Sequence, residues 1–217
     1  MIKGVIFDMD GVIIDSHPIH RKTWKKFLAS LGRLATEEDL DFVLDGRKKE
    51  DILRHFLGDL SPEQVRAYGR QKEVMFREEA LGLKTIEGLT DFLQELHASG
   101  LKSALASSGS RTRVNYILDR LALKKYFPVI VTGDDVSNGK PDPTIFCKAA
   151  DGLGYCCSDL LVIEDSVSGV RAAKSVGMKC LGVADNGRAR LLLEAGADHV
   201  VANFHGLSLA PLGRMLA

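Results

Sequence analysis

The chain has 217 residues, of which 45% are hydrophobic and 27% are charged, and its 29 basic and 29 acidic side chains give zero net charge. This composition is typical of a folded protein with a sizeable hydrophobic core. It shows no basic excess of the kind that nucleic-acid or anionic-membrane binding requires, and no apolar run approaches the ~20 residues of a membrane helix. We therefore expect a cytoplasmic protein with neither nucleic acid nor membrane among its partners.

The N-terminal segment and the cysteines agree with that location. A signal peptide is not expected, because Asp8 and Asp10 interrupt what would be its apolar region. The cysteines lack the CxxC spacing of a metal site, so we expect reduced thiols of a cytosolic protein. A redox role for the adjacent Cys156 and Cys157 is the alternative. The four cysteines are Cys147, Cys156, Cys157 and Cys180.

Short runs rich in Val, Ile and Leu alternate with helical patterns along most of the chain. Strands are predicted over residues 2–8, 102–107, 129–132, 160–164, 179–184 and 199–202. Helices are predicted over residues 87–99, 111–122, 143–152, 167–176 and 187–195. Most of the strand runs are continuously apolar, as expected for parallel strands buried on both faces. The alternation predicts an α/β fold with a doubly wound parallel sheet.

A long segment without a convincing strand separates the first two predicted strands. It is rich in charged residues and helix formers, and helical patterns cover residues 17–31, 37–44, 48–57 and 62–81. Thr36 before three acids and Ser61 before a proline are typical helix starts. Because structureless loops of such length are uncommon, we expect a helical insertion over roughly residues 17–82. The predicted domains are a core of residues 1–15 and 84–217 and a helical cap of residues 16–83.

Polar groups follow four of the predicted strands at their C-terminal ends. They are Asp8 and Asp10 after the first, Ser107 and Ser108 after the second, Lys140 after the third, and Glu164 and Asp165 after the fourth. Carboxyl ends of parallel strands share one edge of the sheet, where ligands bind, so we expect these groups to meet. Carboxylates, a lysine and a hydroxyl suit a hard divalent cation, Mg²⁺, beside a phosphoryl group.

Each of these groups has a simpler explanation when taken alone. Asp165 could cap the helix that follows it, and Lys140 could be a solvated surface residue. Asp8 together with Asp10 is harder to explain in this way, because a helix cap needs one acid and not two. The conjunction of complementary groups after four strands favours a functional site.

The same four segments carry a resemblance to a known family. "DMDGVIIDS", "ALASSG", "GKPDP" and "VIEDSVSGV" resemble, in order and spacing, the four motifs of the haloacid dehalogenase (HAD) superfamily of phosphotransferases. The helical insertion resembles the cap of its β-phosphoglucomutase and sugar-phosphatase branch. The resemblance implies a Rossmann-like core with the active site under the cap.

The resemblance also implies roles for the matched residues. Asp8 would attack phosphorus as the nucleophile and form an aspartyl-phosphate. Asp10 would protonate the departing oxygen and then activate the water or hydroxyl that resolves the intermediate. Ser107 would hold a phosphoryl oxygen, and Lys140 would neutralise charge on the phosphoryl group and on Asp8.

The implied metal is Mg²⁺. Asp8, Asp165 and the main-chain carbonyl of Asp10 would bind it, and Glu164 would be a further ligand, directly or through water. A carboxylate beside Mg²⁺ should stay ionised at neutral pH. The aspartates at positions 8 and 10 of an extended segment face the same way, which suits a shared site.

Four residues of the predicted cap are candidate substrate contacts. His20 and Trp24 lie on one face of its first helix, and the resemblance gives His20 a place where it can orient the general acid/base; plain packing is the alternative. Gly46 and Lys49, in "LDGRKKEDIL", match a segment in which the mutases carry a glycine and an arginine. We expect an anion clamp there, with a solvated helix start as the alternative. Lysine lacks the two-pronged grip of arginine on phosphate.

The loop after the second predicted strand differs from that of the mutases, which usually carry Lys-Asn at the positions of Ser110 and Arg111. Ser108 and Arg111 are candidate substrate contacts, and Arg111 could hold a second phosphate at the helix start or simply be exposed. A mutase that works through a bisphosphate needs a strong second-phosphate site. Of the two basic residues that the mutases usually carry, the arginine is replaced here by Lys49 and the lysine by Ser110, which favours a hydrolase.

We therefore expect a Mg²⁺-dependent phosphatase that acts on a small phosphorylated metabolite, such as a sugar or polyol phosphate. The alternatives are β-phosphoglucomutase-type phosphoryl transfer between sugar hydroxyls and a catalytically inactive HAD-fold binding protein. A response-regulator receiver lacks the long insertion and the late Glu-Asp pair, and no GxGxxG motif indicates a dinucleotide enzyme. The chain is expected to be a monomer or a weak homodimer.

Overall fold

The computed structural model describes residues 2–185 and 187–209 of the chain. Its strands form one sheet in the order β3-β2-β1-β4-β5-β6, and each neighbouring pair is parallel. This is the strand order of a doubly wound Rossmann-like sheet, so the predicted fold class is confirmed. The strands are β1 (Gly4–Phe7), β2 (Lys102–Ser107), β3 (Val129–Thr132), β4 (Leu160–Glu164), β5 (Lys179–Val183) and β6 (His199–Val201).

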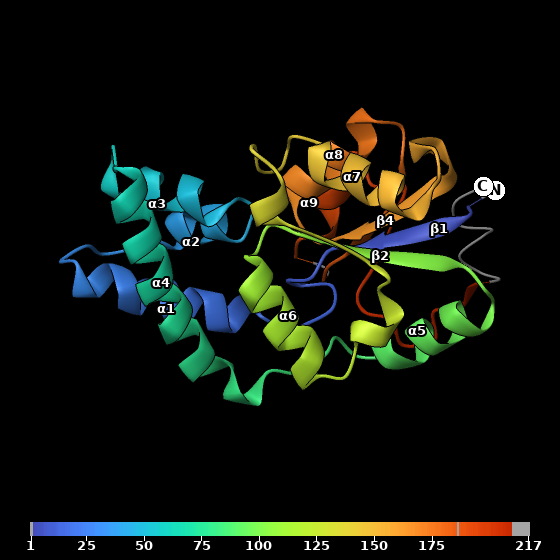
Figure 1. Cartoon of the computed structure of the whole chain (residues 1–217), viewed down its shortest axis with the longest axis horizontal. Coiled ribbons are helices and arrows are strands. Elements are labelled where there is room, and N and C mark those ends of the chain that lie inside the picture. Colours follow the sequence, from blue (N-terminus) through green and yellow to red (C-terminus); the bar gives the residue numbers. More distant parts are fainter. Residues whose placement is uncertain (1, 186, 210–217) are drawn as a thin grey trace.

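Helices cover both faces of this sheet, and on each face a separate hydrophobic cluster lies between the sheet and its helices. Val5 and Phe7 of β1 belong to the cluster on the side of α5 and α6, while Ile6 belongs to the cluster on the side of α7, α8 and α9 (Figure 1). The alternation of side chains along a buried parallel strand explains why β1 is apolar throughout. The core helices are α5 (Leu89–Ala98), α6 (Arg111–Arg120), α7 (Thr144–Leu153), α8 (Val167–Ser175) and α9 (Ala189–Glu194).

The segment between β1 and β2 is helical, as predicted, and it lies to one side of the sheet (Figure 1). Thr36 and Ser61 form capping boxes at the starts of the second and fourth helix, so both expected N-termini are present. The helices pack around a hydrophobic cluster of their own that includes Trp24, Phe27 and Leu53. They are α1 (His17–Ser30), α2 (Glu37–Val43), α3 (Lys49–Leu57) and α4 (Pro62–Glu79).

The two connections between the helical segment and the sheet run side by side. Asp15 N–H donates to the carbonyl of Lys84 at 3.1 Å, and Ile86 N–H donates to the carbonyl of Ile13 at 3.0 Å. The segment therefore enters and leaves at one place and has its own core. We propose on this basis that residues 16–83 form a cap domain on a core of residues 1–15 and 84–217.

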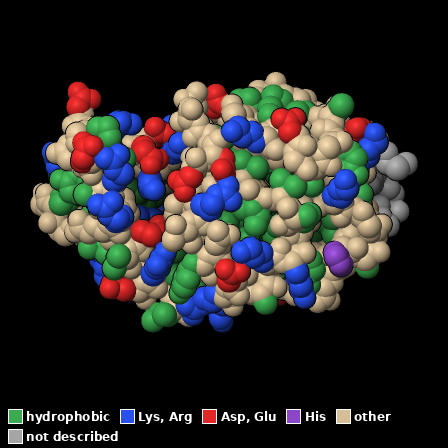
Figure 2. Space-filling model, viewed as in Figure 1, with side chains coloured by type: hydrophobic (Ala, Val, Ile, Leu, Met, Phe, Trp, Pro, Cys, Tyr) green, Lys and Arg blue, Asp and Glu red, His purple; other side chains and the backbone are tan. Residues whose placement is uncertain are grey.

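Two features of the surface bear on possible partners. Lys and Arg side chains are interspersed with Asp and Glu over the face shown in Figure 2, in line with the zero net charge of the chain. Among the described helices, none combines the length and apolar character that crossing a bilayer demands.

A cap with a separate core should unfold separately from the sheet when that core is weakened. Leu28 is fully buried in the cap cluster, so Leu28→Ala should cost about 2–5 kcal/mol and speed hydrogen exchange in α1–α4 more than in β1, β2 and β4. The matched control is Leu34→Ala, because Leu34 is 92% exposed, and it should change neither. Uniformly faster exchange in cap and sheet would show that the chain unfolds as one unit.

Candidate active site

A buried lysine lies between two carboxylates at the carboxyl edge of the sheet. Lys140 Nζ is 2.5 Å from Asp8 Oδ1, directly after β1, and it also contacts Glu164 at the end of β4. Burial lowers the pKa of Lys140, but the two carboxylates outweigh it and the net shift is upward. At Asp8 burial has the opposite effect: it raises the pKa well above its ordinary value, while the charge of Lys140 lowers it. The structure thus brings together predicted site residues from three loops.

Glu164 has protein partners on both carboxylate oxygens. Oε1 contacts Lys140, while Oε2 accepts from the backbone N–H groups of Asp165 and Ser166, both at 2.8 Å, and from the Ser166 hydroxyl at 2.9 Å. Gly169 leaves room for this arrangement, because a Cβ there would lie 1.9 Å from Oε1. Both oxygens of Glu164 thus contact Lys140 and the loop after β4, and its expected role as a metal ligand, directly or through water, stays a prediction.

Asp165 is aimed at the turn that follows β1. Its Oδ2 lies 2.8 Å from His17 Nε2, yet this buried oxygen accepts no well-aligned hydrogen bond among the described residues. Gly11 adopts a φ of +75° beside it, and a Cβ on Gly11 would lie 2.2 Å from Oδ2. Burial raises the pKa of Asp165 while His17 lowers it. His17 is the nearest partner of this oxygen, and a buried carboxylate oxygen with so few partners is the kind of group that a metal ion satisfies.

The donors present fit a magnesium ion, although they do not form a ready-made cage. Within residues 2–185 and 187–209, no cluster of three or more His, Cys, Asp and Glu side chains is placed to hold a metal. Mg²⁺ usually takes one or two carboxylates and keeps several waters. Asp8, Asp165 and the main-chain carbonyl of Asp10 provide oxygen donors of that kind, so the fit rests on these three groups.

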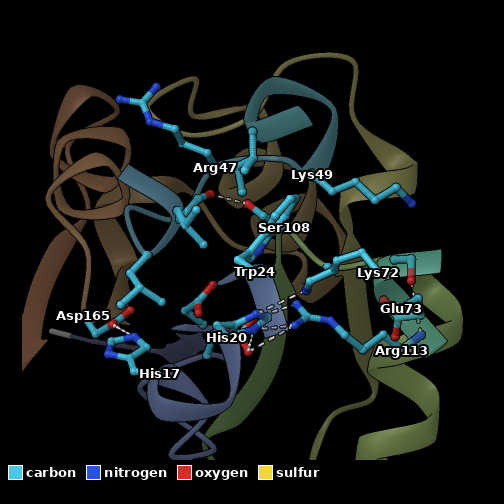
Figure 3. A pocket seen from close by; sticks show the side chains of 18 residues that line it. His17, His20, Trp24, Arg47, Lys49, Lys72, Glu73, Ser108, Arg113 and Asp165 are labelled. Carbon is cyan, nitrogen blue, oxygen red and sulfur yellow. Dashed lines mark hydrogen bonds and ion pairs between the residues drawn. The ribbon is translucent and has the colours of Figure 1, made fainter. Parts of the chain in front are cut away.

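Asp10 is held by a different set of partners. Oδ1 accepts from the Ser16 hydroxyl at 2.7 Å and lies 3.1 Å from His20 Nε2, and Oδ2 accepts from Arg113 Nη2 at 2.6 Å. Figure 3 shows His20 and Arg113 next to each other in the pocket. Burial alone would raise the pKa of Asp10, but Arg113 and His20 hold it well below its usual range. Burial, followed by the charge of Lys72, lowers the pKa of His20 to about 3, so His20 is neutral near pH 7.

A pocket lies between cap and core, above these acids. The predicted cap residues His20, Trp24, Gly46 and Lys49 line it, together with Ser108 from the core. Ser107 lies beneath it, with no exposed surface, and its hydroxyl accepts from the backbone N–H of Gly109. Trp24 also belongs to the cap's hydrophobic cluster, and Lys49 lies along α4 beside Gly69, with 35% of its side chain exposed.

The cap loop around Gly46 is fastened to the core. Ser108 Oγ donates to the Gly46 carbonyl at 2.6 Å, and Lys48 Nζ donates to the Val136 carbonyl at 2.7 Å. Gly46 has a φ of +67°, and a Cβ there would lie 2.7 Å from Ser166 Oγ. Glycine is required at this position by both the backbone conformation and the close approach. The pocket is thus closed on this side by direct contacts between cap and core.

Arg111, expected to contact a substrate, does not line the pocket. Its side chain is 46% exposed, with Nη2 2.5 Å from Asp135 Oδ2, and its backbone N–H donates to Asp134 at 2.8 Å. Ser110 caps α6 by accepting from the N–H of Arg113, which makes Arg111 the first helical residue. Arg113 follows Arg111 by two residues, which is about 200° of rotation around the helix axis. Arg113 therefore faces the pocket, whereas Arg111 faces away from it.

The pocket residues that sequence reasoning missed include His17, Lys72, Glu73 and Arg113. Two of them carried a usable signal. Lys72 stands between Gly69 and Phe76 on the buried stripe of α4, and Arg113 stands four residues before the buried Ile117 on α6. A charged residue on the apolar face of a helix is costly unless it has partners, which marks it as a site candidate.

Substitution of Gly11 should reveal how tightly Asp165 is packed. Gly11 and Gly32 have similar φ values, +75° and +69°, but only at Gly32 would a Cβ have nothing within 4 Å. Gly32→Ala should therefore cost only the backbone strain, roughly 1–2 kcal/mol, whereas Gly11→Ala must also displace Asp165 and should cost clearly more. Urea denaturation of the two variants measures the difference. Equal losses would mean that the Asp165 carboxylate moves freely.

Comparison with known proteins agrees with this geometry. Residues 5–183 match the family model described as haloacid dehalogenase-like hydrolase. A phosphorylated carbohydrates phosphatase from Thermotoga maritima is 34% identical over 216 residues, covering 92% of this chain and 94% of that protein. A β-phosphoglucomutase from Bacillus subtilis is also 34% identical, over 217 residues, covering 96% of this chain and 92% of that protein.

Solved structures share the fold. A β-phosphoglucomutase structure from Clostridium difficile superposes with a TM-score of 0.88 at 24% identity, covering 100% of this chain and 97% of that one. The family model spans most of the chain, and both curated relatives match nearly its full length. The motif residues also meet at one sheet edge, as the family resemblance implies. The chain belongs to the haloacid dehalogenase-like hydrolases.

Proposed function

We propose that this hydrolase is a Mg²⁺-dependent phosphatase that cleaves the phosphate ester of a small phosphorylated metabolite, a sugar or polyol phosphate. The observation that carries the proposal is the pair of nearby aspartates in opposite surroundings. Asp8 contacts the buried Lys140, while Asp10 is held at the pocket wall by Arg113 and His20. The phosphatase name of the Thermotoga maritima relative supports the substrate class.

In this proposal Asp8 attacks phosphorus as the bond from phosphorus to the ester oxygen breaks, giving an aspartyl-phosphate. Protonated Asp10 gives its proton to the departing oxygen, and the resulting carboxylate, the form that Arg113 favours, takes a proton from the water that hydrolyses the intermediate. Lys140 offsets negative charge on Asp8 and the phosphoryl group, and Ser107 with the neighbouring N–H groups holds phosphoryl oxygens. Asp8, Asp165 and the Asp10 carbonyl would hold Mg²⁺, which supplies charge neutralisation at the phosphoryl group.

Hydrolysis is favoured over mutase chemistry by the start of α6. A mutase must hold a second phosphate firmly, yet Arg111 pairs with Asp135 outside the pocket and Ser110 is uncharged. Arg113 does reach the pocket, but its guanidinium contacts Asp10. The β-phosphoglucomutase relative keeps the mutase reaction as the competing activity. The proposed cytoplasmic location and the monomer or weak homodimer state stay predictions.

Phosphate release separates the competing functions directly. With Mg²⁺ and a panel of sugar and polyol phosphates, we expect rapid release of inorganic phosphate and little conversion in a bisphosphate-primed β-glucose 1-phosphate isomerisation assay. Asp8→Asn should lower release by on the order of 10³-fold or more, because the attacking oxygen is lost. Rapid isomerisation with negligible release would make the protein a mutase, and no turnover of any ester would support an inactive binding protein.

Two neighbouring acids should respond differently to substitution. Asp165→Asn should raise the Mg²⁺ concentration for half-maximal activity by at least about 10- to 100-fold and weaken Mg²⁺ binding in calorimetry, because it removes a ligand charge. Glu164→Gln should leave Mg²⁺ binding nearly unchanged but lower kcat, because Lys140 loses one of its two carboxylates. Loss of Mg²⁺ affinity in Glu164→Gln would show that Glu164 is a metal ligand, directly or through water.

A further inference from the structure

One guanidinium group contacts the core, the cap and Asp10 at the same time. Arg113 belongs to α6 of the core and is 5% exposed. Its Nη1 lies 2.8 Å from His20 Nε2 on α1 (Figure 3). Its Cζ lies 5.2 Å from the ring centroid of Phe76 on α4. Gly109 leaves the space for it, because a Cβ there would lie 2.4 Å from Nη2. The position of this group is therefore determined from several sides.

The two carboxylate oxygens of Asp10 differ in how many partners they have. Oδ1 is crowded by three partners, namely the Ser16 hydroxyl, His20 Nε2 and Arg113 Nη1. Oδ2 has one partner among the described residues, Arg113 Nη2 at 2.6 Å. Since a carboxylate oxygen can accept two hydrogen bonds, Oδ2 keeps an acceptor position while its direction is fixed by the arginine.

We infer that Arg113 is a positioning residue that presents Asp10 Oδ2 as the atom that takes the proton from the hydrolytic water. This inference rests on the proposed phosphatase function. In the step concerned, the water oxygen bonds to phosphorus as the bond from phosphorus to Asp8 breaks, and a water proton passes to Asp10 Oδ2. The products are inorganic phosphate and the free carboxylate of Asp8.

No other described cation near Asp10 can replace Arg113 in this task. Lys72 is buried, but the hydrogen-bond partner that the structure gives its ammonium is His20 Nδ1 at 3.3 Å, and it otherwise lies over the rings of Trp24 and Phe76. A lysine also lacks the planar fork that engages both oxygens of a carboxylate. Replacement of Arg113 should thus free Asp10 to rotate, with Ser16 and His20 as its remaining partners.

The test uses p-nitrophenyl phosphate, whose leaving group departs without a proton. With this substrate kcat/KM reports the phosphorylation of Asp8, and kcat reports hydrolysis of the intermediate once that step is slow. Arg113→Ala should lower kcat by about 10² or more, show a burst of p-nitrophenol and keep kcat/KM within a few-fold of the parent. Arg113→Lys should not restore kcat, whereas added guanidinium ion should partly restore it in Arg113→Ala.

Arg111→Ala is the matched control, because it removes the same side chain two residues earlier on α6, outside the pocket. It should behave as the parent protein. Equal losses in kcat and kcat/KM for Arg113→Ala, with no burst and no effect of guanidinium, would reduce Arg113 to a structural residue. Unchanged kinetics would overturn the inference entirely.

A crystal structure of Arg113→Gln separates this inference from the proposed function. We expect the Asp10 carboxylate to rotate away from its position in the parent protein, and this readout does not need turnover. If the parent protein hydrolyses no phosphate ester, the proposed function fails whatever Asp10 does. If the parent hydrolyses esters and Asp10 keeps its place in Arg113→Gln, the inference fails alone.

Discussion

The buried ammonium of Lys140 is the interaction on which the rest of the site depends. Its side chain has no exposed surface, and it contacts the carboxylates of Asp8 and Glu164. A buried cation without anions is costly, and so are two buried carboxylates without a cation. The three groups are therefore stable only as a set, which fixes the loops after β1, β3 and β4 relative to one another. Asp165 inherits its position from this set, because its backbone N–H donates to Glu164.

Asp8 and Asp10 are the same residue type, but their carboxyl groups lie in different surroundings. Asp8 lies against the sheet edge with Lys140, while Asp10 lies past the end of β1, where Gly11 turns the chain towards the cap. Burial and neighbouring acids raise the pKa of Asp8, whereas the Arg113 guanidinium and the hydrogen bond with His20 lower the pKa of Asp10. Mg²⁺ beside Asp8 would restore its ionised form, which is the form that a nucleophile needs.

Much of the fold and part of the site could be predicted because a parallel sheet constrains both strongly. Short runs rich in Val, Ile and Leu, most of them continuously apolar, predicted the six strands of the sheet, and the shared carboxyl edge predicted that Asp8, Lys140 and Asp165 lie together. The start of α6 could not be predicted in the same way. Whether Arg111 or Arg113 faces the pocket depends on which serine caps the helix, and Ser107, Ser108 and Ser110 are all chemically suited to that task. Ser110 is the cap. A helix start displaced by one residue would rotate both arginines by about 100° around the helix axis.

The adjacent acids Glu164 and Asp165 show the same limit at a strand end. Successive residues of an extended chain point to opposite sides, so only one of the two can face the turn at Gly11. The sequence does not say which, because either carboxylate suits a metal. The structure decides through hydrogen bonding: Glu164 points inward, where Lys140 and two backbone N–H groups use its oxygens, and Asp165 Oδ2 has His17 Nε2 as its nearest partner, at 2.8 Å. In the proposed site, Glu164 therefore supports Lys140 and the loop after β4, while Asp165 faces the turn at Gly11, where a metal ion would bind.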